Sequence, residues 1–77
     1  TTDIEFSVPI AVNVEIKVYD ILGREVTTLV NEFVQPGKYR VRWNGTDRDG
    51  RQVSSGVYLY VMKAGKFIQT KKMMLLK

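Results

Sequence analysis

Residues 57–62 constrain the fold more than any other stretch of this 77-residue chain. The run is rich in β-branched and aromatic residues, which favour extended structure. One face of the expected strand carries Val57, Leu59 and Val61, and the other carries Tyr58, Tyr60 and Met62. A strand that is apolar on both faces lies centrally in its sheet, or presents one face to a contact surface. The rest of the chain must therefore supply strands that pair with this one.

Several other segments have the character of strands. Residues 3–8, 12–19 and 38–43 alternate between apolar and polar residues with a period of two, which is typical of half-buried strands. Residues 67–76 form the expected last strand, after a hairpin turn at residues 64–66. Residues 24–30 are less regular, because Val26 and Leu29 are three apart. A β-bulge, or a departure from the sheet after Thr28, reconciles that spacing with a strand.

Turn formers separate these segments. Asp20 and Gly23 suit the first and last positions of a type I turn. Residues 31–37 and 44–50 are expected loops, and Val53 is expected in a short strand or an extended approach to the next strand. The spacing predicts about seven strands and no helix. We therefore expect an all-β fold, a small Ig-like or fibronectin-like antiparallel β-sandwich that forms a single domain over residues 1–77.

The alternation also predicts a core between the two sheets of the sandwich. Each inward face is the apolar face of its strand. Either Tyr58 or Leu59 is expected to face this core from the central strand. The predicted core residues are Phe6, Val14, Ile16, Val18, Tyr39, Val41 and Trp43.

Composition argues against catalysis. The chain has no histidine and no cysteine, so the commonest general base and the commonest metal ligands are missing. Residues 46–50 contain Asp-x-Asp-Gly, which resembles part of a calcium loop, but a hairpin loop capped by its own side chains fits better. The four tyrosines and Trp43 could form a platform for sugars or bases, but strand spacing favours core and sheet positions. We predict no enzymatic activity, no metal, no cofactor and no small-molecule substrate.

Charge is distributed unevenly along the chain. Residues 1–20 carry a net charge of −3, and residues 63–77 carry +5, from five lysines and no acid. A basic end can bind nucleic acid, an anionic membrane surface or a protein receptor. The simpler interpretation, which we favour, is an edge strand kept soluble by lysine.

Ordered short motifs along almost the whole chain suggest a family. The stretches are residues 2–9 (TDIEFSVP), 18–26 (VYDILGREV), 36–39 (PGKY), 43–45 (WNG), 55–58 (SGVY) and 72–77 (KMMLLK), with Asp47 and Gly50 between them. In this order, with a terminal lysine, they resemble the C-terminal sorting domain of proteins exported by the type IX secretion system. That family overlaps a larger set of Ig-like modules similar to the one in the flagellar hook-capping protein. Family members usually carry an Asn-Pro-rich segment just before the first strand, and this sequence begins after that point.

The resemblance implies a non-catalytic signal at the C-terminus of a larger passenger protein. Its partners would be the outer-membrane secretion machinery and the passenger, with no role for nucleic acid. The passenger would be secreted or held at the cell surface of a Gram-negative bacterium. The residues to which the resemblance assigns recognition are Gly56, Val57, Tyr58, Lys71, Lys72 and Lys77. Two alternatives remain open, a structural Ig-like spacer or assembly module and a carbohydrate-binding module.

Overall fold

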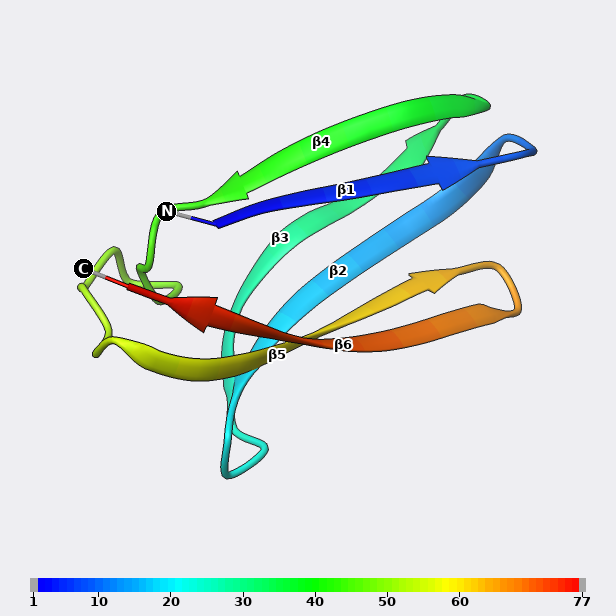
Figure 1. Cartoon of the computed structure of the whole chain (residues 1–77). Helices are drawn as coiled ribbons and strands as arrows, with labels where there is room; N and C mark the ends of the chain where they lie inside the picture. Colours follow the sequence, from blue (N-terminus) through cyan, green and yellow to red (C-terminus); the bar gives the residue numbers. More distant parts are fainter. Residues whose placement is uncertain (1, 77) are drawn as a thin grey trace.

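A computed structural model, which describes residues 2–76, contains six antiparallel strands in two sheets (Figure 1). The strands are β1 (Thr2–Val8), β2 (Val12–Asp20), β3 (Glu25–Val34), β4 (Gly37–Trp43), β5 (Gly56–Ala64) and β6 (Phe67–Leu75). They form a small sandwich-like domain, which confirms the predicted all-β class. The expected seventh strand near Val53 is not among them. Residues 44–55 close into a loop instead, with an isolated bridge between Thr46 and Gln52 and a hydrogen bond of 2.9 Å from Val53 N to Gly45 O.

The two sheets differ in width. One sheet has the order β3-β2-β5-β6, and the other contains only β1 and β4. The strand β5 pairs with β2 on one side and with β6 on the other, as its two apolar faces predict. Its inward residues Tyr58, Tyr60 and Met62 are buried, whereas the outward residues are half-buried. The strands β6 and β3 form the edges of the wide sheet.

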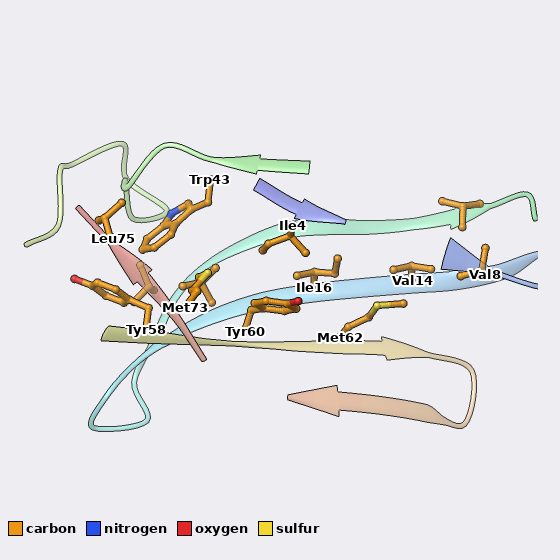
Figure 2. Packing of buried hydrophobic residues seen from close by; sticks show 13 residues of the cluster. Ile4, Val8, Val14, Ile16, Trp43, Tyr58, Tyr60, Met62, Met73 and Leu75 are labelled. Atoms are coloured by element: carbon orange, nitrogen blue, oxygen red, sulfur yellow. The ribbon is translucent and has the colours of Figure 1, made fainter. Parts of the chain in front are cut away.

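Trp43, Tyr58 and Ile4 fill the space between the sheets at one end (Figure 2). Trp43 on β4 is 1% exposed, and its ring meets the edge of Tyr58 on β5 at a centroid distance of 5.0 Å. Its indole Nε1 donates a hydrogen bond of 2.9 Å to Thr46 O, so the buried polar atom is satisfied. Of the two candidates for the inward position on β5, the structure selects Tyr58 over Leu59.

The predicted core was right for β2 and incomplete elsewhere. Val14, Ile16, Val18 and Trp43 are fully buried. Three predicted core residues, Phe6, Tyr39 and Val41, are only half-buried and pack against the margin of the core. They lie on the narrow sheet, where two strands cannot shield every inward side chain. Phe6 and Tyr39 shield each other by stacking, at a centroid distance of 5.3 Å. Buried residues outside the prediction are Ile4, Val8, Val26, Val34, Tyr60, Met62, Met73 and Leu75.

The irregular strand is explained by bulges. In the pairing of β2 with β3, Ile16 faces Val30 and Lys17 faces Thr28, so Leu29 is an extra residue. A second register shift between Val18 and Tyr19 leaves Val26 as the other extra residue. Of the two alternatives that the spacing allowed, the structure supports a bulge over a departure from the sheet after Thr28. Val26 and Leu29 lie at the bulges and both reach the core, Val26 buried and Leu29 half-buried.

The same strand is longer than expected. Residues 31–34, predicted as loop, continue β3 to Val34, because β2 supplies a pairing partner along its whole length. Asn31 keeps a polar partner there, accepting a bond of 3.5 Å from Asn13 Nδ2. Val34 is buried at the end of this strand, whereas Phe33 is exposed.

Replacing Trp43 tests the packing between the sheets. The change Trp43→Ala should lower the free energy of unfolding by about 3–5 kcal/mol, because it leaves a large cavity where two sheets meet. Urea denaturation measures the loss. The control Phe33→Ala removes an exposed aromatic ring and should change stability by no more than about 0.5 kcal/mol. Equal stability of the Trp43→Ala protein and the wild type would show that Trp43 does not hold the sheets together.

Candidate functional site

The antiparallel pairing of β5 with β6 brings the predicted recognition residues onto neighbouring strands. Gly56, Val57 and Tyr58 pair with Leu75, Met74 and Met73, respectively. Further along, Lys72 lies opposite Leu59, and Lys71 lies opposite Tyr60. Lys77 lies outside the described residues. Two groups of residues that are about 15 positions apart in the sequence therefore share one corner of the wide sheet (Figure 1).

Tyr58 is part of the core. Its side chain is buried, and its hydroxyl donates a hydrogen bond of 2.6 Å to Ser54 O. Its ring packs against Trp43. A partner protein cannot reach this ring without disturbing the core, so Tyr58 can affect recognition only by fixing the start of β5.

Gly56 is required by its backbone conformation. Its φ is +152°, in the region that residues with a Cβ rarely adopt. A Cβ built at this position would meet no atom within 4 Å, so close approach of another chain segment is not the reason for glycine. The positive φ is therefore the reason for glycine at this position.

The strand β6 has one unpaired edge and carries both basic and apolar side chains. It pairs only with β5, so the backbone groups of its other side have no strand partner in residues 2–76. Lys71 and Lys72 are exposed on opposite faces of the strand. The sequence-based site did not include the large exposed apolar residues of this segment, Phe67, Ile68, Met74 and Leu76. Met74 and Leu76 alternate in the sequence with Met73 and Leu75, which are buried. This alternation could have identified Met74 and Leu76 as exposed apolar residues.

Ion pairs neutralise the acidic residues of the first strand. On the narrow sheet, Asp3 pairs with Arg42 at 2.9 Å and Glu5 with Arg40 at 2.6 Å, each across the strand register. The hydrogen bond from Arg42 is the main reason that the pKa of Asp3 lies below its usual value. These exposed pairs contribute little stability. Their main consequence is that the negative charge of β1 is locally compensated.

The lysines of the β5–β6 hairpin have no such partners. None of the ion pairs found in residues 2–76 includes Lys63, Lys66, Lys71 or Lys72. Glu25 is already engaged by Lys17, at 3.2 Å, and by Arg48. The hairpin therefore carries uncompensated positive charge, and anionic partners would be attracted to it.

The acidic loop and the aromatic residues that the sequence raised as possible sites have structural roles. In the loop before β5, Asp47 Oδ1 accepts backbone hydrogen bonds from Asp49 N and Arg51 N, at 2.9 and 3.0 Å, as a capping residue does. No group of three or more residues that could hold a metal ion occurs in the described part of the chain. Trp43, Tyr58 and Tyr60 are buried, so they cannot form an aromatic platform. No helix in residues 2–76 is long and apolar enough to cross a membrane.

The two antiparallel sheets define a small all-β, sandwich-like module. Comparison with protein families makes the assignment more specific. The model of the FlgD Ig-like domain matches residues 1–66, and the chain belongs to this family of non-catalytic modules. The matched range ends at Lys66, immediately before β6. Neither the curated proteins nor the solved structures contain a significant match.

The turn between β2 and β3 contains the clearest electrostatic feature. As predicted, Gly23 N donates to Asp20 O at 3.0 Å, which closes the turn. The carboxylate of Asp20 accepts bonds from Arg24 N, Leu22 N and Arg24 Nε, at 2.9, 3.0 and 2.8 Å. These bonds, that of the Arg24 backbone foremost, hold the pKa of Asp20 below its ordinary value. The ionised carboxylate therefore stabilises the turn.

Acid titration tests this feature. Because the pKa of Asp20 is lowered on folding, its contribution is present above the ordinary carboxyl pKa of about 3.9 and is lost as pH falls through the folded value. We expect Asp20→Asn to lower stability at neutral pH and to make the decline of stability below about pH 4 shallower than in the wild type. Thermal denaturation across pH measures both effects. The control Asp49→Asn also removes one carboxylate, and identical pH profiles for the two variants would contradict the assignment.

Proposed function

We propose that this Ig-like module is a C-terminal sorting signal that directs a larger passenger protein across the outer membrane by the type IX secretion system. The observation that carries the proposal is the strand β6, which has exposed apolar side chains and an edge with no strand partner in residues 2–76. Its lysines occur in no ion pair found in the same residues. The ordered motifs of the sequence support it, and membership of the FlgD Ig-like family is compatible with it. In this proposal the passenger precedes Thr1 and becomes secreted or attached to the cell surface.

Docking would use the free edge of β6. An unpaired strand can accept an additional strand from another protein, with backbone hydrogen bonds providing affinity. Lys71 and Lys72 project to opposite faces of β6. A receptor strand along this edge would therefore be flanked by acidic residues on both of its faces. Such charge complementarity mainly accelerates association and provides specificity.

The lysines of β6 also fit a simpler role. Lysines on an edge strand prevent unwanted pairing between copies of a protein, so the charge could serve solubility alone.

The Gly56–Tyr58 segment would act indirectly in the proposed function, because Tyr58 fixes the start of β5 and thereby the position of its partner β6. The lysines are thus the residues with which recognition can be separated from folding.

Membership of the FlgD Ig-like family favours a second candidate, a structural spacer or assembly module of the hook-capping kind. Such a module would self-associate or connect other domains and would have no effect on export. A carbohydrate-binding role is not favoured, because the aromatic residues that it needs are mostly in the core. Export therefore distinguishes the two remaining functions.

A charge variant tests sorting without disturbing the fold. The change Lys71→Gln with Lys72→Gln and Lys77→Gln should alter stability little, since surface substitutions usually stay within about 0.5 kcal/mol. A reporter fused to the wild-type domain should be exported by a type IX-competent host. The triple variant should be exported more slowly, and docking to the secretion machinery should become less sensitive to salt.

The control is a second charge variant, Lys38→Gln with Arg51→Gln. Both residues are exposed and lie outside β6, and neither occurs in an ion pair found in the described residues. This variant should be exported like the wild type. Unchanged export of the folded triple variant would show that the lysines only keep an edge soluble. Retention of the unmodified fusion inside the cell would favour the spacer.

A further inference from the structure

An apolar groove lies where the narrow sheet fails to cover the wide one. Its volume is about 530 Å³, and it lies between the end of β1 and the β5–β6 hairpin. These two parts lie at the same end of the molecule in Figure 1. Val12, Met62 and Ala64 belong to its lining from the wide sheet, and Val8, Ile10 and Phe67 belong to it at the rims. Ile10 and Phe67 are more than half exposed, at 64% and 55%, so this apolar surface is in contact with water.

One side of the groove is the free edge of a strand. The strand β1 pairs with β4 alone, so its other side has backbone donors and acceptors without a strand partner in residues 2–76. At its first residue β1 reaches β6, where Thr2 Oγ1 donates to Met74 O at 3.2 Å. At the other end of β1, Val8 and Phe67 both line the groove, which lies between them. The space beside β1 is therefore closed at one end and open at the other.

The hairpin turn is shaped to lie close to β2 at the groove. Gly65 has a φ of +61°, and a Cβ at this position would lie 3.3 Å from Val12 Cγ2. Glycine therefore allows the turn to approach Val12 more closely than another residue could. The base of the groove is thus a continuous apolar surface formed by β2, β5 and the turn.

We propose that this groove binds an extended peptide segment of a partner polypeptide, which adds to the free edge of β1 as a third strand of the narrow sheet. An Ig-like sandwich typically has seven strands, and the added strand would complete that number here. A strand edge combined with an apolar base suits an extended chain, because the backbone can pair with β1 while alternate side chains enter the groove. A compact amphiphile would leave the β1 edge unpaired.

Charge specifies the partner further. Among residues 2–76, Lys66 is the one ionisable residue that lines the groove, and no acidic residue of this range lines it. Lys71 lies on the same face of the hairpin, opposite Tyr60. Neither lysine occurs in an ion pair found in the described residues. The segment that fits is therefore apolar at alternate positions and acidic at its ends. This binding uses β1 and the inner face of the hairpin, so it does not depend on the proposed sorting role.

A synthetic peptide tests the proposal. The probe is a capped eight-residue peptide of alternating valine and threonine with a glutamate at each end. Titration of the 77-residue chain, followed by NMR, should give saturable shifts at Val8, Val12, Ala64 and Phe67. The same peptide with N-methylated backbone amides should not bind, because it cannot donate to β1. Absence of binding by the unmodified probe, or equal binding by its N-methylated form, would overturn strand addition.

Two neighbouring residues provide a matched pair of variants. Phe67→Ser removes an aromatic side chain from the groove and should weaken binding by about tenfold. Ile68→Ser removes a similarly exposed side chain from the opposite face of β6 and should leave affinity unchanged. Equal effects of the two changes would overturn the assignment to the groove. Concentration-dependent dimerisation of the chain alone, with shifts at the same residues, would show that a second copy is the occupant and would also overturn it.

Discussion

The contact of Trp43 with Tyr58 joins two sheets of unequal size, and the rest of the structure depends on it. The narrow sheet has only two strands, and an isolated pair of strands is marginally stable at best in water. It persists by placing Trp43 and Ile4 against the wide sheet. A domain of this length buries a limited share of its surface, so it has few other contacts with which to replace this one. Tyr58 in turn is held by its hydrogen bond to Ser54, which fixes the start of β5.

The unequal sheets also determine which surfaces remain available to partners. Four strands on one side and two on the other leave part of the inner face of the β5–β6 hairpin uncovered. The same arrangement leaves β1 and β6 with unpaired edges. Asp3 and Glu5 of β1 are paired with arginines of β4, so they do not compensate the positive charge near these two surfaces. The proposed partners would therefore meet two surfaces that the fold of this non-catalytic module family leaves exposed.

Period-two alternation predicted most of the strands correctly because each strand has one face against the core. The irregular spacing of Val26 and Leu29 allowed either a bulge or a departure from the sheet, and the register shifts between β2 and β3 show that it is a bulge. The alternation could not predict how wide each sheet is. For this reason Phe6 and Val41 were expected in the core but lie at its margin, and residues 31–34 were expected as loop but continue β3. Such features depend on pairing partners that are distant in the sequence.

For the candidate site, the sequence placed Lys71 and Lys72 correctly on a basic last strand but left open whether Tyr58 or Leu59 faces the core. The apolar groove was not predictable either, because its lining comes from parts of the chain that are far apart in the sequence. Val8, Ala64 and Phe67 meet at the groove only after both sheets have formed. Short motifs identify a family more readily than they reveal such a surface.

The central claim is that β6 is an unpaired edge, whereas β5 is paired on both sides. Amide hydrogen exchange followed by NMR tests this directly. Amides along β5 should be protected throughout. In β6, protection should alternate, with slow exchange where the N–H points towards β5 and fast exchange where it points away. Uniform protection along the whole of β6 would show that its edge is already covered and would contradict the account.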